Sequence, residues 1–207
     1  MTDQIQIPIF NSEEILSNYH FADRLNLYID EVLEYNKKVN IVSRETSAAE
    51  LRKIAADCLV PFEFLAPPGG HFFDIGSGGG FPSIVLLLAF PGLRATLFER
   101  TGKKVSFLRR FIEQSQLSAE VIKSDFVENH GRQEPGSFDF GTIKLVRPDK
   151  KILRGAMELL RPGAALIYYA SAEKANSESL ASFRAVSHHY YLDDSKALRA
   201  ITFFSKQ

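Results

Sequence analysis

The chain has 207 residues, 45 % of them hydrophobic, which fits one domain with a sizeable core and room for a small appended subdomain. Lys and Arg balance Asp and Glu at 25 each, so the net charge does not indicate a nucleic-acid binder, and the single cysteine, Cys58, excludes an intramolecular disulfide and a Cys-based zinc site. No apolar run approaches the roughly 20 residues that span a bilayer. The N-terminus also lacks a basic start and an apolar signal core, so we expect a soluble protein of the cytoplasm.

Residues 12–66 are predicted to be helical. Asn11 or Ser12 can cap the first helix, and apolar side chains then recur at helical spacing from Phe21 to Leu33. A second helix is predicted over residues 48–65, and the Pro-Pro-Gly-Gly run at 67–70 ends the region. We therefore expect an N-terminal helical extension over residues 1–68 and a second domain over residues 69–207.

The second domain alternates strands and helices. Strands are predicted at 71–76, 94–100, 119–125, 137–146 and 164–170, helices at 82–90, 103–116, 149–160 and 173–183, and two final strands at 184–192 and 198–206. Alternation of this kind indicates right-handed crossovers and a mostly parallel sheet. Only residues 193–197 separate the last two strands, and so short a connection predicts an antiparallel hairpin.

The sequence DIGSGGG, residues 74–80, follows the first strand of this domain, where a doubly wound sheet binds ligands. Gly76 can adopt a positive φ, Gly78 lets the backbone approach a ligand, and Gly80 eases the loop into the next helix. A tight turn without a ligand is the alternative. Asp74 can order the loop and balance a positive charge on the ligand, or be purely structural.

Acidic and aromatic residues follow the next two strands. Glu99 lies 23 residues beyond Gly76, close to the spacing at which a carboxylate accepts hydrogen bonds from ribose hydroxyl groups. Its alternative is an exposed surface carboxylate. Asp125, Phe126 and Val127 would lie beside the same crevice and meet an adenine ring; alternatively Asp125 caps a helix and Phe126 belongs to the core.

These residues suit either NAD or S-adenosylmethionine. Phe81 stands where the dinucleotide-binding pattern has a glycine or alanine, and no basic or glycine cluster is available for a second nucleotide half. The antiparallel ending also resembles that of class I methyltransferases. We therefore favour S-adenosylmethionine as the cofactor and count Phe81 among the residues that bind it.

Three stretches resemble the RsmG family, also called GidB: YIDEVLEYNKKVNIVSRET, DIGSGGGFPSIVLLLAFPGLRATLFERTGKKVSFLRRFIEQ and FDFGTIKLVRPDKKILRGAMELLRPG. The resemblance covers roughly residues 25–170. It implies a class I methyltransferase fold, Rossmann-like, with a seven-stranded, mostly parallel sheet, an antiparallel C-terminal hairpin and an N-terminal helical extension. It also implies methyl transfer from S-adenosylmethionine to N7 of a guanine in 16S ribosomal RNA.

The chain departs from the family pattern on the presumed substrate side. Lys53-Ile54 stands where the family has Arg-His, and Ile143-Lys144-Leu145 stands where it has Ser-Arg-Ala. Lysine does not reproduce the bidentate bonding of arginine. We expect Lys144, at the end of the fourth strand, to border cofactor and base and to be the catalytic-site residue.

Basic side chains are unevenly distributed, with six in residues 94–110 and six in residues 144–161. RNA phosphates are expected to contact Lys37, Lys38, Arg44, Lys103, Lys104, Arg109 and Arg147. The alternative for the basic residues of 103–110 is the solvated face of an amphipathic helix. A metal site at His188-His189 is disfavoured, because neighbouring residues of a strand point to opposite faces.

Three other functions remain open: an NAD-dependent oxidoreductase, a methyltransferase with another substrate, and a relative that binds cofactor or RNA without catalysis. We expect a monomer that acts on 16S ribosomal RNA or the small ribosomal subunit, without a metal and without a membrane.

Overall fold

The computed structural model describes residues 6–66, 68–175 and 183–206. Three helices form the N-terminal part: α1 (Ser12–Ser17), α2 (Ala22–Asn36) and α3 (Ala48–Leu59), followed by the 3-10 turn η1 (Val60–Glu63). Asn11 caps α1 by accepting from the N–H of Glu14, and Ser47 and Glu50 form a reciprocal capping box on α3. The helices predicted in this region are thus present.

The prediction of helix throughout residues 12–66 is wrong for residues 37–47, which form a loop between α2 and α3. Asn36, buried at the end of α2, explains the break. Its Oδ1 accepts from the N–H groups of Ile41 and Val42, at 2.8 and 3.1 Å, and its Nδ2 donates to Ser43 O. An asparagine side chain that bonds to nearby backbone in this way competes with continued helix.

The central sheet has eight strands in the order β1-β7-β8-β6-β5-β2-β3-β4. Their bounds are β1 (Ile9–Phe10), β2 (His71–Ile75), β3 (Arg94–Phe98), β4 (Ala119–Ile122), β5 (Phe140–Ile143), β6 (Leu166–Tyr168), β7 (Phe183–Leu192) and β8 (Arg199–Lys206). Strand β8 is antiparallel to both β6 and β7, whereas β2, β3, β4, β5 and β6 are mutually parallel. The predicted mostly parallel sheet with an antiparallel C-terminal hairpin is confirmed.

The eighth strand, β1, extends the sheet beyond the seven strands expected. It pairs in parallel with β7, through Ile9 opposite Tyr191 and Phe10 opposite Leu192. The N-terminal extension therefore contributes a strand as well as helices. A two-residue strand carries too little alternation to be recognised in the sequence.

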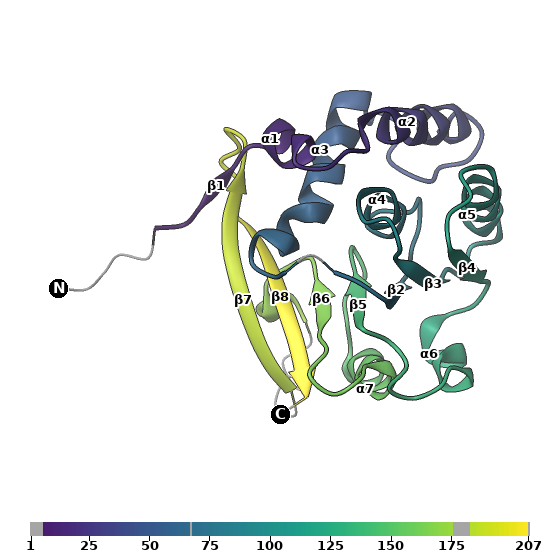
Figure 1. Ribbon diagram of the computed structural model, residues 1–207, viewed down its shortest axis with the longest axis vertical. Helices are drawn as coiled ribbons and strands as arrows, with labels where there is room; N and C mark the ends of the chain where they lie inside the picture. Colours follow the sequence, from purple (N-terminus) through teal and green to yellow (C-terminus); the bar gives the residue numbers. More distant parts are fainter. Residues whose placement is uncertain (1–5, 67, 176–182, 207) are drawn as a thin grey trace.

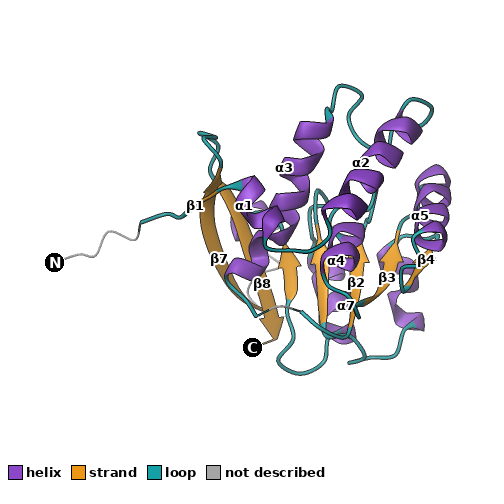
Figure 2. Cartoon of the chain, turned by 45° about the horizontal axis from the view of Figure 1, so that its top comes forward, coloured by secondary structure: helices purple, strands orange, loops and turns teal. Residues whose placement is uncertain are grey.

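Helices cover both faces of the sheet. Figure 1 shows α4 (Ser83–Ala89) and α5 (Gly102–Gln114) on the same side as α1, α2 and α3, with α6 (Phe126–Asn129) and α7 (Lys150–Leu159) on the other. Figure 2 shows the strands side by side between these layers. Two cores result, one beneath the N-terminal helices, α4 and α5, and one beneath α6 and α7. The first core contains residues from both sides of residue 68. The predicted domain boundary there stays a prediction.

Most of the helix predicted over 173–183 lies outside the described residues; its described start is a 3-10 turn, η3 (Ala172–Lys174). Another such turn, η2 (His130–Arg132), follows α6. No helix of the described chain is long and apolar enough to cross a membrane. Since β2 to β6 run parallel, the residues that follow them meet at one edge of the sheet, and that edge carries the candidate site.

Candidate functional site at the carboxyl edge of the sheet

The glycine loop after β2 has the backbone that its sequence predicts. Gly76, Gly78 and Gly80 have φ values of +71°, +57° and +96°, which residues other than glycine rarely adopt. A Cβ at Gly76 would lie 2.6 Å from Val146, and one at Gly80 would lie 2.8 Å from the hydroxyl of Tyr28. At Gly78, however, only the Gly76 carbonyl oxygen lies within 4 Å of that position. The loop is packed below Gly76 and Gly80 and open at Gly78, as a cradle for a ligand requires.

Glu99, just beyond β3, holds this loop in place. Its exposed fraction is only 6 %, and its two carboxylate oxygens accept from the N–H of Gly78 at 2.9 Å and from that of Thr101 at 2.7 Å. A carboxylate oxygen has two lone pairs, so each oxygen can still accept a bond from a ligand hydroxyl. The alternative of an exposed surface carboxylate is therefore wrong, and the ribose role stays a prediction.

A hollow of about 200 Å³ brings several predicted cofactor residues together. Gly76, Glu99, Asp125 and Phe126 all line it, although they come from three separate connections of the sheet. Asp125 caps α6 by accepting from the N–H of Val127 at 3.0 Å, and Phe126 is 3 % exposed in the core. Both structural alternatives thus hold, and both residues still border the hollow.

Phe81 and Val127 lie outside the lining of this hollow. Phe81 is half-buried and packs against the ring of Tyr28, with ring centroids 5.1 Å apart. Val127 packs against the second core. Their predicted contacts with the cofactor stay predictions.

Asp74 lies beneath the glycine loop and is 1 % exposed. Its Oδ1 accepts from the hydroxyl of Thr142 at 2.7 Å, whereas its Oδ2 has no partner among the described residues. Burial raises the pKa of this carboxyl, and the Thr142 hydroxyl offsets the rise only in part. A buried carboxylate with one unsatisfied oxygen is costly by itself and favours a positive charge nearby.

The N-terminal extension supports the glycine loop from above. The hydroxyl of Tyr28, which is fully buried in α2, donates to Gly79 O at 2.6 Å. The loop that Asn36 organises also meets Gly79, since a Cβ there would lie 3.4 Å from Ile41 O. Two independent contacts therefore tie the extension to the loop predicted to bind the cofactor. Sequence reasoning did not find this role of Tyr28, because its partner lies 51 residues away.

Lys144 follows β5 at the same edge and pairs with a buried carboxylate. Its Nζ donates to Asp57 Oδ2, and it lies 4.7 Å from the centre of the Tyr169 ring. Asp57, in α3, also accepts from Tyr190 at 2.7 Å and from Arg199 at 2.9 Å. Burial alone would raise the pKa of Asp57, but the two cations and the Tyr190 hydroxyl hold it below its usual value.

This cluster unites residues of α3, β7 and β8 with Lys144, which follows β5, and sequence reasoning missed Asp57, Tyr190 and Arg199 as its members. No spacing rule in the sequence connects these three residues, which come from α3, β7 and β8. Leu145, the next residue after Lys144, has φ +61° and is 97 % exposed. A leucine in this conformation carries backbone strain, which is often found at functional sites.

The predicted RNA-contacting residues differ in their surroundings and in their partners. Lys104 lines the hollow with Glu99, and Arg147 lines a neighbouring hollow of about 530 Å³. Lys37 pairs with Glu34, and Arg109 donates to Val121 O at 2.8 Å. Arg44 donates to Asn40, and Lys38 and Lys103 are exposed. Side-chain hydrogen bonds and ion pairs within the described chain are thus fewest for Lys38, Lys103, Lys104 and Arg147.

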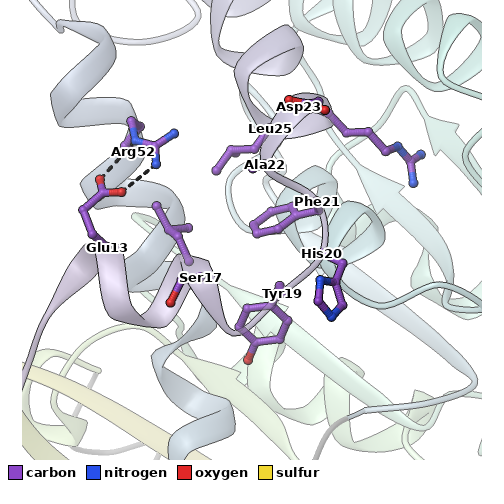
Figure 3. A pocket seen from close by; sticks show the side chains of 11 residues that line it. Glu13, Ser17, Tyr19, His20, Phe21, Ala22, Asp23, Leu25 and Arg52 are labelled. Atoms are coloured by element: carbon purple, nitrogen blue, oxygen red, sulfur yellow. Dashed lines mark hydrogen bonds and ion pairs between the residues drawn. The ribbon is translucent and has the colours of Figure 1, made fainter.

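Another hollow, of about 540 Å³, lies within the N-terminal extension. Figure 3 shows the ion pair between Glu13 and Arg52 on one side of it and Tyr19, His20 and Phe21 on the other. None of the predicted site residues lines it. The described residues also contain no group of three His, Cys, Asp or Glu side chains that could hold a metal. His188, which belongs to strand β7, packs against the ring of Phe64.

Comparison with known proteins relates this arrangement to one family. The family model named GidB, described as rRNA small subunit methyltransferase G, matches residues 22–197. A protein of Chloroflexus aggregans with the name Ribosomal RNA small subunit methyltransferase G is 32 % identical over 73 % of this chain and 64 % of its own length. One of Polynucleobacter asymbioticus with the same name is 30 % identical over 79 % of this chain and 74 % of its own length. The chain thus spans just under two thirds of the first relative.

Solved structures confirm the class I methyltransferase fold. The crystal structure of the tRNA (m1A58) methyltransferase TrmI from Aquifex aeolicus superposes with a TM-score of 0.53 at 16 % identity, covering 70 % of this chain and 67 % of that one. At this identity the similarity is one of fold.

Proposed function

Because the chain belongs to the GidB family of rRNA small subunit methyltransferases G, we propose that it transfers a methyl group from S-adenosylmethionine to N7 of a guanine in 16S ribosomal RNA. The observation that carries the proposal is the Glu99 carboxylate bonded to Gly78 N–H within the matched segment. One contact joins the acidic residue after β3 to the glycine loop after β2, as a nucleoside site at the edge of a doubly wound sheet needs.

The residues present fit the cofactor. The open position at Gly78 admits close approach of a ligand to the backbone, and the free lone pairs of Glu99 suit ribose hydroxyl groups. The hollow between Gly76, Asp125 and Phe126 suits an adenine ring. The unsatisfied Oδ2 of Asp74 suits the positive charge of the methionine end. Gly80 and Phe81 shape the loop around it, and Val127 flanks the adenine end.

S-Adenosylmethionine, when bound, supplies an electrophilic methyl group on a sulfonium sulfur. Guanine N7 has an in-plane lone pair and no proton, so no residue of this chain has to act as a general base. The work of the protein is then to hold base and methyl donor in line, which alone can lower the barrier by several kcal/mol. To Lys144, which follows β5 and is held by Asp57, we assign the contact with the base.

The proposed substrate also explains the basic edge. Phosphate contacts from Lys37, Lys38, Arg44, Lys103, Lys104, Arg109 and Arg147 would position RNA without reading its sequence. Ribosomal RNA is a cytoplasmic substrate, and we propose that the protein acts there as a monomer. Size-exclusion chromatography with light scattering measures the molar mass in solution and so tests the monomeric state.

Calorimetric titration of the folded protein with S-adenosylmethionine and with NAD tests the cofactor. The proposal predicts binding of the former and none of the latter. Binding of NAD alone would favour an oxidoreductase, which the match to the methyltransferase family and the replacement at Phe81 disfavour. Cofactor binding without any methyl transfer would indicate a non-catalytic relative.

A further inference from the structure

A third hollow at the carboxyl edge, of about 360 Å³, lies on the side of Lys144 away from the glycine loop. It is lined by residues that follow β5 and β6 and by the ends of β7 and β8, among them Lys144, Tyr169, Lys174, His189 and Arg199. It shares Leu145, Tyr169, Ala170 and Lys174 with the hollow that contains Arg147. That hollow in turn shares Val146 with the one bordered by Glu99. The three hollows therefore follow one another along the edge.

The described lining of this third hollow carries a net positive charge. Among the described residues, its lining contains Lys144, Lys174 and Arg199 and two carboxylates, Asp57 and Glu173. Asp57 is 3 % exposed and is bonded to two of the three cations, so it cannot neutralise both. A concave surface with a net positive charge and low-dielectric walls attracts anions.

Arg199 has guanidinium N–H donors that make no bond to the described residues. Its Nη1 donates to Asp57, while Nε is buried and has no partner among the described residues. The side chain as a whole is 39 % exposed, so the guanidinium is anchored at one nitrogen and still accessible. Guanidinium has five N–H donors in a rigid fork, which matches the oxygens of a phosphate.

Asp57 fixes the orientation of both cations. Its Oδ2 accepts from Lys144 and its Oδ1 from Arg199 and Tyr190, so one buried carboxylate joins the ends of β5 and β8. Burial, with Asp57 close by, raises the pKa of Tyr190, so that its hydroxyl stays protonated and donates. Because the two side chains are already held in place, they lose less conformational entropy when they bind a ligand.

We propose that this hollow binds one backbone phosphate of the RNA next to the target base, through Arg199 and Lys174, with Asp57 as the positioning residue. The proposal rests on the RNA substrate proposed above. It assigns Arg199 and Lys174 a role in the binding of RNA that their sequence positions did not indicate. It also gives Lys144 a fixed position between the phosphate and the predicted cofactor site.

The test measures the binding of the full chain to an unmodified 16S ribosomal RNA transcript as a function of salt. Loss of one phosphate contact lowers the slope of log affinity against log salt by about 0.7 to 0.9. We expect this reduction, with binding about tenfold weaker or more, for Arg199→Gln, and a partial return of affinity for Arg199→Lys. In methyl transfer to small-subunit particles, Arg199→Gln should raise KM and leave kcat within about twofold.

Arg184→Gln is the matched control, because Arg184 is exposed in the same hairpin and pairs with Ser205 at its opposite end. It should keep the wild-type slope and KM. Lys174→Gln provides a second test variant if Arg199→Gln fails to fold, since Lys174 is exposed and should lower the slope in the same way. A thermal melt of each variant establishes that it is folded.

Wild-type slope and KM in both Arg199→Gln and Lys174→Gln would overturn the proposal, even where the wild type transfers methyl groups. Binding of inorganic phosphate that Arg199→Gln abolishes, while the same variant keeps the wild-type slope and affinity for RNA, would make this a site for free phosphate and also overturn the proposal. A wild type that binds RNA with the expected slope but transfers nothing would contradict the proposed function and leave the phosphate site supported.

Discussion

Two buried aspartates, Asp74 before the glycine loop and Asp57 beside Lys144, show how differently two parts of the site are built. Asp74, beneath the glycine loop, is 1 % exposed and has one hydroxyl donor, while Asp57 in α3 is 3 % exposed and has two cations and a tyrosine. Burial raises the pKa of Asp74, whereas the cations lower that of Asp57. The carboxylate of Asp57 thus has its counter-charges within the protein, whereas the carboxylate of Asp74 has none among its partners. Substitutions that remove one charge at a time can test this difference.

The largest expected effect is at Asp57. Asp57→Asn removes the charge that Lys144 and Arg199 share and leaves two partly buried cations without a counterion. Breaking a buried ion pair from one side typically costs about 3–5 kcal/mol of stability. We predict a loss of that size in the free energy of unfolding, measured by urea denaturation. Exposed Asp194 gives a control, and Asp194→Asn should change stability by less than about 0.5 kcal/mol.

The next effect is at Glu99. Glu99→Gln places an amide group opposite one of two N–H donors, those of Gly78 and Thr101, and so disturbs the loop. We predict affinity for S-adenosylmethionine about 10- to 100-fold weaker, measured by calorimetric titration. Glu128→Gln, exposed on α6, is the control and should bind as the wild type does. Unchanged affinity in Glu99→Gln would refute the ribose assignment.

Tyr28 tests whether the N-terminal extension supports the glycine loop. Tyr28→Phe leaves Gly79 O without its 2.6 Å hydrogen bond in a buried position. We predict a loss of about 1–2 kcal/mol in stability and cofactor binding weakened several-fold, both measured as above. Tyr19→Phe is the control, since Tyr19 packs through its ring against Phe21 and Phe90 and does not contact the glycine loop through a hydrogen bond between described residues. Equal effects of the two changes would show that the contact with Gly79 does not matter.

Leu145 allows a test with a smaller expected effect, on the backbone strain that its positive φ causes. Because its φ is +61°, Leu145→Gly should stabilise the protein by about 1 kcal/mol, while Leu145→Ala keeps the strain and should not. If the strained leucine serves RNA binding at this edge, Leu145→Gly should lower methyl transfer despite its higher stability. Thermal melts and a transfer assay measure the two quantities. A Leu145→Gly variant that is less stable than Leu145→Ala would contradict the strain.

The smallest change in stability at neutral pH is expected for Asp74→Asn, within about 1 kcal/mol of the wild type, because the charge it removes is unfavourable where it lies. The two aspartates should also differ in their pH dependence. A raised native pKa means that Asp74 lowers stability as pH rises through the window above its unfolded value of about 3.9, and Asp74→Asn should abolish that fall.

A lowered native pKa means the opposite for Asp57. Its contribution is complete above about pH 4 and is lost as pH falls through the lower native value, so Asp57→Asn should flatten the acid limb of the stability curve. Urea denaturation at several pH values between roughly 3 and 7 measures both curves. The same slope in both variants would contradict the opposite directions of the two pKa shifts.

How much of this could be predicted from the sequence depends on distance along the chain. Gly76, Gly78 and Glu99 lie within one strand–helix–strand unit, so their spacing and residue types were enough to bring them together. The alternation of strands and helices likewise predicted the sheet and its final hairpin. Contacts local to one such unit obey rules of spacing that a single sequence displays.

The Asp57 cluster obeys no such rule. Asp57 and Arg199 are 142 residues apart, and Tyr28 and Gly79 belong to different predicted domains. These contacts depend on how the N-terminal helices lie on the sheet, which a pattern of apolar residues does not specify. For the same reason the sequence could not tell that Arg109 is bonded to Val121 O within the protein while Lys38 is exposed.

The account is tested most directly by mass-spectrometric mapping of 16S ribosomal RNA from cells with and without this protein. It predicts one methylated guanine, modified at N7, that is lost without the protein and restored by incubating the deficient small-subunit particles with wild-type protein and S-adenosylmethionine. Glu99→Gln should restore it only at raised cofactor concentration. An identical set of methylated nucleotides with and without the protein would contradict the account.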